Sequence, residues 1–524
     1  MKIKSLLVGM LACTAMVSCT NEEALENNEV IKGGEKSYVS VNIVAPGSVT
    51  GRAASDFEAG SADEVIVNDA VFLFLNDKFK GCATPYYTND LPEFGDADGV
   101  GQDKKATVLV IDAAKEVPTY LVAILNPVNK DAYTASTTLA DLKAENEAYT
   151  TYTAKNFVMS NAVYRASNGK EAAATPITMD YIFDSAAKAE AKPLTIQVER
   201  VVGKVIVNGL EDAAEEWTMN DGDEYTNDQI DNDETKQLRL RITGWDILQN
   251  NKSTLVKNVD LAWDHTWWND LDLKRSYWAK DYTKAGRNEL LIDEMGEAAF
   301  RYVEETVSQT PNSVEADNVN PYLVVAGEFV DAEGKTVELV EWRGRKYTMD
   351  GYLNFIAGNS KVSQYWTKNE NGTYTSFSVD LLELVADEDV DWLASAQLKN
   401  ENTQFFTCTF NPDGTVANAT PLEDNAPVVA AIEEFGKVQY WNGGNTYYYT
   451  PITHQVKGTD NFYGVVRNHV YNVIISSITG YGTPVSHPDN AIEIPEKPVD
   501  DHSYLAAEVV ILDWKVVKNE VDLN

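Results

Sequence analysis

Cys19 is the residue whose surroundings most clearly predict a chemical modification. Lys2 and Lys4 precede an apolar run over residues 6–17, and the sequence turns polar and acidic directly after Cys19. This pattern predicts an export signal peptide over residues 1–18, too short to anchor the chain as a membrane-spanning helix. The segment Met16-Val17-Ser18-Cys19 also resembles a bacterial lipobox, in which the Cys thiol takes a diacylglycerol.

Two other interpretations of this segment stay open. Cys13 has a similar setting, but cleavage there would leave the apolar residues 14–17 exposed. The segment could also be an ordinary signal peptide with two incidental Cys. The change in polarity favours Cys19 as the lipid carrier, with two or three acyl chains forming a stable anchor.

Arg52 is the only arginine among the first 164 residues, and small or polar residues surround it at positions 49–56. An isolated arginine in such a loop is accessible to an arginine-specific protease, which would cut between Arg52 and Ala53. Taken alone, the simpler interpretation is a solvated loop cation.

Other patterns with chemical potential fail on spacing. The acidic stretches at residues 96–107 and 220–234 lack the register of a calcium loop, and Gly334-Lys335-Thr336 lacks the first Gly of a phosphate-binding loop. The five His show no ligand spacing. We therefore expect no enzyme, no catalytic residue, no metal site and no cofactor.

An aromatic cluster stands out at residues 263–278. Trp263, Trp267, Trp268 and Trp278 are four of the eleven tryptophans. A stacking platform for sugar rings is one interpretation. Packing inside a β-sandwich core is the other, and it is favoured because aromatic side chains dominate such cores.

The composition limits the partners. The 524 residues include 81 acidic and 43 basic side chains, for a formal net charge of −38. Such a surface repels phosphate, so we expect no nucleic-acid partner. No apolar run of about 18 residues follows the signal peptide, so the membrane is contacted only through the lipid. Cys82 and Cys408 could form a disulfide or remain buried thiols, and we favour thiols.

The elements that must hold these residues are mostly strands. Residues 37–44 alternate polar and apolar side chains, with Val39, Val41 and Ile43 on one face. Further β-rich runs cover residues 65–75, 107–111, 120–125, 194–207, 238–243, 322–329, 337–342 and 471–475. Residues 138–146 form one short helix capped by Ser136 or Thr137. These runs predict an all-β protein of antiparallel sandwiches.

The segment at residues 507–524 is rich in Val, Ile and Leu. A long apolar strand left in water would aggregate, so its own domain or another molecule must cover it. Its apolar members are Val509, Ile511, Trp514, Val516, Val517, Val521 and Leu523.

Together these features resemble the Bacteroidales fimbrillins, or type V pilins, and most of all the major subunit of the short (minor) fimbriae. The likeness is carried by residues 157–161 (FVMSN), 198–205 (VERVVGKV), 275–281 (RSYWAKD), 465–471 (VVRNHVY), 514–517 (WKVV) and 520–523 (EVDL). It implies two tandem β-sandwich domains of transthyretin-like type, at residues 53–208 and 209–524, completed by donor-strand exchange.

The resemblance also implies a maturation pathway at the outer membrane. An arginine- or trypsin-like protease cuts after Arg52, and the propeptide at residues 19–52 leaves with its lipid on Cys19. The strand bearing Val39, Val41 and Ile43 is thereby displaced, and a strand from a neighbouring subunit, around Val509 to Leu523, replaces it. Such head-to-tail contacts do not close and so produce a filament.

The expected function is thus a shaft subunit of a cell-surface fimbria that supports adhesion and biofilm formation. Expected partners are further copies, anchor and tip proteins, the protease, and host or bacterial surface receptors. A tip or accessory subunit is one alternative. A glycan-binding surface lipoprotein that uses the Trp263 to Trp278 cluster is another.

Overall fold

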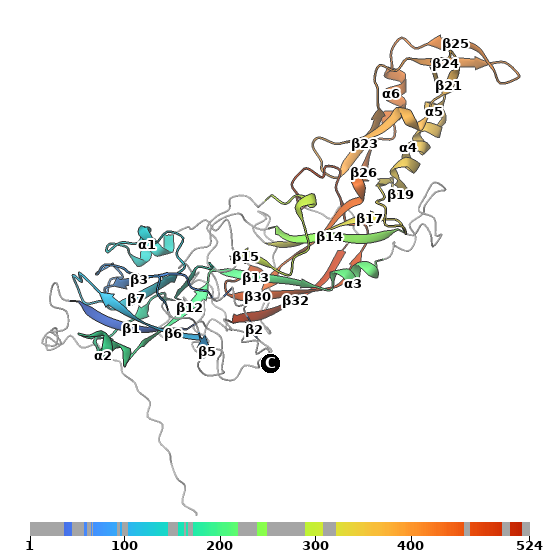
Figure 1. Ribbon diagram of the computed structural model, residues 1–524. Helices are drawn as coiled ribbons and strands as arrows, with labels where there is room; N and C mark the ends of the chain where they lie inside the picture. The colour runs from blue at the N-terminus through green and yellow to red at the C-terminus, as the bar shows by residue number, and fades with distance from the viewer. Residues whose placement is uncertain are drawn as a thin grey trace, which may run out of the picture.

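The computed structural model describes residues 36–44, 57–59, 64, 66–91, 95–96, 103–144, 156–161, 164–165, 171–217, 238–248, 289–307, 321–454, 462–494 and 504–515. Strands dominate these residues and the helices are few and short, so the chain is all-β, as predicted. Figure 1 shows two β-rich bodies and a projecting arm. We name them the N-terminal body, the middle body and the arm (residues 339–441).

A nine-stranded sheet makes up most of the N-terminal body. Its order is β4-β3-β7-β8-β12-β1-β6-β5, and β11 pairs with β7. The strands are β1 (Ser37–Val44), β3 (Ala70–Leu75), β4 (Tyr86–Thr88), β5 (Gly95–Asp96), β6 (Asp103–Ile111), β7 (Tyr120–Leu125), β8 (Met159–Asn161), β11 (Thr175–Pro176) and β12 (Leu194–Arg200). A separate ladder joins β9 (Tyr164–Arg165) to β10 (Glu171–Ala172).

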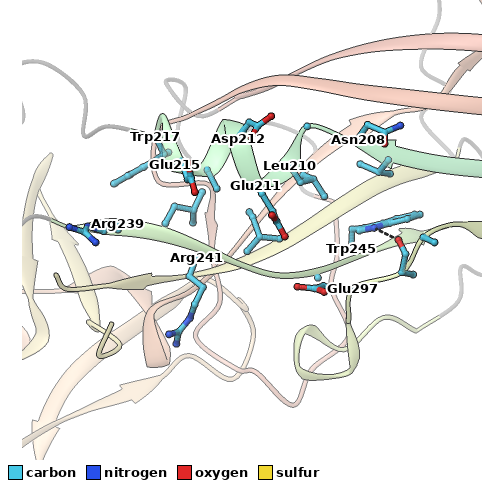
Figure 2. A pocket seen from close by; sticks show the side chains of 18 of the residues that line it. Asn208, Leu210, Glu211, Asp212, Glu215, Trp217, Arg239, Arg241, Trp245 and Glu297 are labelled. Atoms are coloured by element: carbon cyan, nitrogen blue, oxygen red, sulfur yellow. Dashed lines mark hydrogen bonds between the residues drawn. The ribbon is translucent and has the colours of Figure 1, made fainter. Parts of the chain in front are cut away.

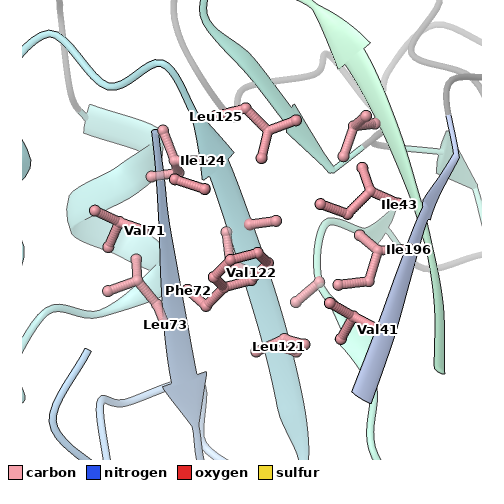
Figure 3. Packing of buried hydrophobic residues seen from close by; sticks show 14 of the residues in the cluster. Val41, Ile43, Val71, Phe72, Leu73, Leu121, Val122, Ile124, Leu125 and Ile196 are labelled. Atoms are coloured by element: carbon pink, nitrogen blue, oxygen red, sulfur yellow. The ribbon is translucent and has the colours of Figure 1, made fainter. Parts of the chain in front are cut away.

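The core of this body lies between two layers of strands. Figure 3 shows Val41 and Ile43 of β1 and Ile196 of β12 opposite Val122 of β7 and Phe72 of β3. β3 is buried along its whole length and β7 along nearly all of it. Continuous apolar runs of this kind indicate strands that are covered on both faces.

The middle body contains three sheets, of orders β15-β13-β30-β32-β2, β14-β17-β27-β31 and β16-β29-β28. Their strands are β2 (Phe57–Ala59), β13 (Val202–Asn208), β14 (Arg239–Leu248), β15 (Arg301–Glu304), β16 (Thr306–Val307), β17 (Tyr322–Val330), β27 (Asn445–Pro451), β28 (Thr453–His454), β29 (Phe462–Val465), β30 (His469–Thr479), β31 (Thr483–Pro484) and β32 (Tyr504–Lys515). The sheets are mainly antiparallel, but β13 and β30 run parallel, as do β2 and β32.

The arm has a core of its own and two sheets, of orders β19-β18-β26-β23-β22 and β21-β20-β24-β25. Its strands are β18 (Leu339–Trp342), β19 (Arg345–Thr348), β20 (Tyr365–Lys368), β21 (Tyr374–Ser376), β22 (Leu382–Ala386), β23 (Leu393–Leu398), β24 (Phe405–Phe410), β25 (Val416–Pro421) and β26 (Lys437–Trp441). The chain enters the arm through the turn at residues 331–334, where Gly334 has a φ of 82°. The turn is a short hairpin at its base, where Val330 pairs antiparallel with Thr336, but the flanking strands β17 and β18 belong to different sheets.

The helices lie at the surface of these sheets. They are α1 (Leu139–Ala144), α2 (Ala186–Glu190), α3 (Leu210–Glu215), α4 (Met349–Gly358), α5 (Ser360–Ser363) and α6 (Ala426–Glu433), with single 3-10 turns at η4 (Lys130–Ala132), η5 (Met179–Tyr181), η7 (Ile292–Glu294), η8 (Val379–Leu381) and η9 (Asn442–Gly444). α1 falls within the predicted helix, but Thr138 caps it, through a reciprocal pair of bonds with Asp141.

The predicted strand over residues 194–207 is two strands. β12 ends at Arg200, β13 begins at Val202, and each joins a different sheet. Gly203 lies so close to Val465 that a Cβ atom would stand 2.3 Å from its Cγ1. The buried clusters of the two bodies also meet here, between Val202 and Val205. The limits of the two domains stay a prediction.

Candidate strand-exchange site

β1 lies inside the nine-stranded sheet, and its apolar side chains are fully buried. Val39, Val41 and Ile43 are each 0% exposed. Ser40, on the opposite face, is 1% exposed, and α2 packs against β1, so both faces are covered. Burying three aliphatic side chains stabilises the body by roughly 5–9 kcal/mol, at about 1.5–3 kcal/mol each.

The backbone of β1 has partners along both edges. β6 pairs with it antiparallel along its whole length, whereas β12 pairs in parallel with residues 41–44 only. Upstream, Tyr38 and Phe183 each donate an N–H to the other's carbonyl oxygen at 2.8 Å. Loss of β1 would therefore expose unpaired backbone groups on both sides of an apolar groove.

Residues 45–56 connect β1 to β2, and these two strands belong to different sheets. β1 belongs to the N-terminal body, whereas β2 pairs in parallel with β32 of the middle body, Phe57 opposite Asp513 and Ala59 opposite Lys515. Arg52 and Ala53 fall in this connection, outside the described residues. A cut after Arg52 would leave β1 with no covalent link to the chain that follows.

β32 contains the first half of the predicted donor segment. Its residues 504–513 pair antiparallel with β30, so that Val509 stands opposite Val473 and Ile511 opposite Tyr471. Trp514 stands opposite Glu58 of β2. Val516, Val517, Val521 and Leu523 follow β32 and lie outside the described residues. Cys19 and the tryptophans at residues 263–278 also lie outside them.

A buried polar junction, not anticipated from the sequence, lies between the two bodies. Glu64 is 0% exposed, and its Oε1 accepts bonds from Lys204 Nζ at 2.9 Å and Tyr302 Oη at 2.7 Å. Its backbone oxygen accepts two bonds from the Arg200 guanidinium, at 3.0 and 3.2 Å. Arg200 also donates to Asn468 Oδ1 at 3.2 Å.

This junction joins two places where the chain passes between the bodies. Arg200 and Lys204 flank the step from β12 to β13, and Glu64 lies between β2 and β3. In the sequence, only the alternation of charged and apolar residues at 198–205 gave a signal for this junction. Glu64 gave none, because a glutamate in an acidic chain has no distinguishing pattern.

The two described cysteines are free thiols, as favoured from the sequence. Cys82 is buried in the N-terminal body, where desolvation, aided by the charge of Glu116, raises its pKa to about 12. Cys408 lies in β24 of the arm, and partial burial raises its pKa as well. Neither thiol is therefore activated as a nucleophile.

A cavity of about 1170 Å³ lies in the middle body, between α3 and β14. Figure 2 shows Glu211 on the α3 wall and Glu297 on the opposite wall. Arg241, also in its lining, is paired with Glu328 at 2.7 Å. The cavity is lined by residues of the middle body and has no part in the groove that β1 occupies.

Within the described ranges, no helix is long and apolar enough to span a membrane. In the same ranges, no three His, Cys, Asp or Glu side chains are grouped so that they could hold a metal ion.

Fold and site together define an all-β protein whose first strand completes one body and is joined to the next through residues 45–56. Residues 439–520 match the family described as "Major fimbrial subunit protein type IV, Fimbrillin, C-terminal". This C-terminal segment is therefore similar to the C-terminal part of fimbrillins, a family of fimbrial subunits. The match covers β30 and β32.

Several solved structures resemble the chain at low sequence identity. One is a candidate cell adhesion protein from Bacteroides eggerthii, with 9% identity over 93% of this chain and 99% of the other and a TM-score of 0.34. Another is a candidate cell adhesion protein from Parabacteroides distasonis, with 10% identity over 93% of this chain and 99% of the other and a TM-score of 0.38. The tip fimbrial protein Mfa3 from Porphyromonas gingivalis is also similar, with 12% identity over 91% of this chain and 100% of the other and a TM-score of 0.34. No curated protein matches the chain in sequence.

Proposed function

We propose that this chain is a shaft subunit of a fimbria, exported as a precursor lipidated on Cys19, cut after Arg52, and polymerised by strand donation. The observation that carries the proposal is the position of β1. It is an internal strand at residues 37–44 in which Val39, Val41 and Ile43 are fully buried, yet it precedes an isolated arginine and joins the chain that follows through residues 45–56 alone.

Cleavage converts this stable arrangement into an acceptor. The three apolar sites of Val39, Val41 and Ile43 and the exposed edges of β6 and β12 would be filled by a strand with alternating apolar residues. The segment after β32 has that alternation in Val521 and Leu523. Val509 and Ile511 are already paired with β30, so the donated part lies downstream of Lys515.

The decisive experiment combines an Arg52→Ala variant with N-terminal sequencing of surface protein. Wild-type fibres should consist of chains beginning at Ala53, because cleavage must precede strand exchange. Arg52→Ala should accumulate as an uncut, lipid-labelled precursor without fibres, measured by mass spectrometry and electron microscopy.

Arg343→Ala is the matched control, because Arg343 is exposed in the turn between β18 and β19 and should not affect maturation. Wild-type fibres from Arg52→Ala, or surface protein beginning at Cys19, would sink the proposal. Immunogold labelling along the whole fibre supports a shaft role, whereas labelling at one end only would assign the chain to the tip.

A further inference from the structure

Among the described residues, charged side chains protect the longer free sheet edges of this molecule, with one exception. A free edge presents unpaired N–H and C=O groups, and charged side chains or a very short strand normally protect it. Within the described residues, all other edge strands longer than three residues carry charge: Arg239 and Arg241 in β14, Arg301 in β15, Arg345 and Lys346 in β19, and Glu383 in β22.

The exception is β25 (Val416–Pro421) at the end of the arm. It has six residues, none of them charged, and β24 is its sole partner in the described part of the chain. Pro421 removes one N–H donor at its last position, so the neutral edge available for pairing runs over residues 416–420. Figure 1 places it at the outermost end of the arm, far from both bodies. The charged Asp413 lies in the preceding turn, outside the strand.

The whole sheet shares this lack of charge. Lys368 is the one charged residue in its four strands, although 24% of the chain is charged. Ala417, Asn418 and Thr420 of β25 are exposed, and Phe410, opposite Val416 at the edge, is 46% exposed. A second strand laid along β25 would pair its backbone and cover apolar surface.

The charge of the molecule favours a second copy of the chain as that strand. Two chains that each carry a net charge of −38 repel each other over most of their surfaces. The electrostatic free energy of approach is lowest where two neutral patches meet. An edge strand pairs antiparallel with its own copy about a two-fold axis, so one patch supplies both sides of the contact. The small side chains of Ala417, Asn418 and Ala419 leave room for a close approach.

We propose that β25 is a homotypic lateral contact, through which the arms of two molecules pair edge to edge into one continuous sheet. The contact does not depend on strand exchange and uses a different part of the chain. In fibres it would link neighbouring filaments, and many weak contacts along two filaments would add up to bundling.

Salt dependence gives the first test, on the full-length, uncleaved chain in analytical ultracentrifugation. Added NaCl screens the repulsion between the acidic molecules, so dimerisation should strengthen as salt rises from about 0.01 to 0.15 M, where the Debye length falls from about 30 to 8 Å. An association held by ion pairs would weaken over the same range. A chain that stays monomeric at all salt concentrations overturns the proposal.

Substitution at the edge gives the second test. Asn418→Lys with Thr420→Lys places like charges across the two-fold contact, and dimerisation should weaken about tenfold or more. Thr407→Lys is the matched control, because Thr407 is exposed on the inner strand β24, directly opposite Thr420, and should leave dimerisation unchanged. An unchanged thermal unfolding midpoint in all variants shows that the arm is folded.

Two outcomes contradict the proposal. Equal dimerisation of the edge variant and wild type would place the contact elsewhere. Binding of wild type to a neutral glycan on an array, lost in the edge variant while dimerisation persists, would assign the edge to a carbohydrate. Polymerisation of the uncleaved chain would argue against the proposed maturation. It would not argue against the lateral contact, because that contact is tested separately, by comparing dimerisation of the edge variant with dimerisation of Thr407→Lys.

Discussion

At the scale of single residues, Glu64 joins parts of the chain that are far apart in sequence. Lys204, Tyr302 and Arg200 all bond to it, and Glu64 and Lys204 are buried with side-chain exposures of 0% and 7%. The buried charges of Glu64 and Lys204 are stable only while they are paired, because neither side chain can return to water while the bodies stay docked. The junction should therefore determine how firmly the two bodies are held together.

Glu64→Ala should destabilise the uncleaved protein by about 3–5 kcal/mol, since it removes the carboxylate that is ion-paired with the buried Lys204. A clear fall in the thermal unfolding midpoint checks this. Glu64→Leu combined with Lys204→Met should cost less than Glu64→Ala alone. Lys36→Ala is the control, because its ion pair with Asp112 is long and exposed, at 3.8 Å, and contributes at most about 1 kcal/mol. If Glu64→Ala and Lys36→Ala lowered the thermal unfolding midpoint equally, the junction would not hold the two bodies together.

At the scale of elements, strands with a clear pattern were predictable and the connections between sheets were not. Residues 37–44 alternate so regularly that both limits of β1 were predicted. The break between β12 and β13 was not, because Val201 continues the same apolar pattern and only tertiary contacts separate the sheets. The arm was not predicted either: the turn at Gly334 is a hairpin, as its residues indicate, but nothing in the sequence shows that β17 and β18 continue into different sheets.

The candidate site has a signal in the sequence only where it depends on local pattern. The apolar face of β1 and the isolated Arg52 are visible in the sequence. The pairing of Val509 and Ile511 with β30 is not, since a Val- and Ile-rich segment indicates a strand without indicating its partner.

Substitutions in β1 and β12 should differ in which form of the protein they affect. Ile43→Ala should destabilise the uncleaved chain by about 2–5 kcal/mol, through a cavity in the core. It should leave the mature fibre unchanged, because the proposed cleavage removes β1. Thermal unfolding of the precursor and heat dissociation of fibres measure the two effects.

Ile196→Ala is the matched control. Ile196 stands opposite Ile43 in the parallel pair and is also 0% exposed, but it belongs to β12, which the proposed cleavage would leave in the mature subunit. It should weaken both precursor and fibre. If Ile43→Ala also weakened fibres, β1 would have to remain in place after assembly.

At the scale of the whole molecule, the two bodies repeat one arrangement of strands. The order β8-β12-β1-β6 in the first matches β15-β13-β30-β32 in the second, with the same sequence of antiparallel, parallel and antiparallel pairs. β30 thus occupies in the middle body the position that β1 occupies in the N-terminal body. The difference is that β30 is continuous with the chain on both sides.

Deleting residues 516–524 should separate folding from assembly. β32 ends at Lys515, so the truncated subunit should keep its thermal unfolding midpoint while forming no fibres. In the full chain, Val521→Asp with Leu523→Asp should have the same effect, whereas the matched pair Glu520→Asn with Asp522→Asn should assemble. Normal polymerisation of the truncated chain, followed by electron microscopy, would refute donation by this segment.

The equivalence of β1 and β30 has a consequence for how fibres grow. Under the proposed maturation, cleavage after Arg52 would remove one strand, β1 of the N-terminal body, so each mature subunit would offer a single vacancy and a single insert. A fibre built on this rule cannot branch, and its two ends are chemically different: one bears an empty groove, the other an unused strand. Elongation then has a direction, and a subunit lacking either feature would end the chain at a defined pole.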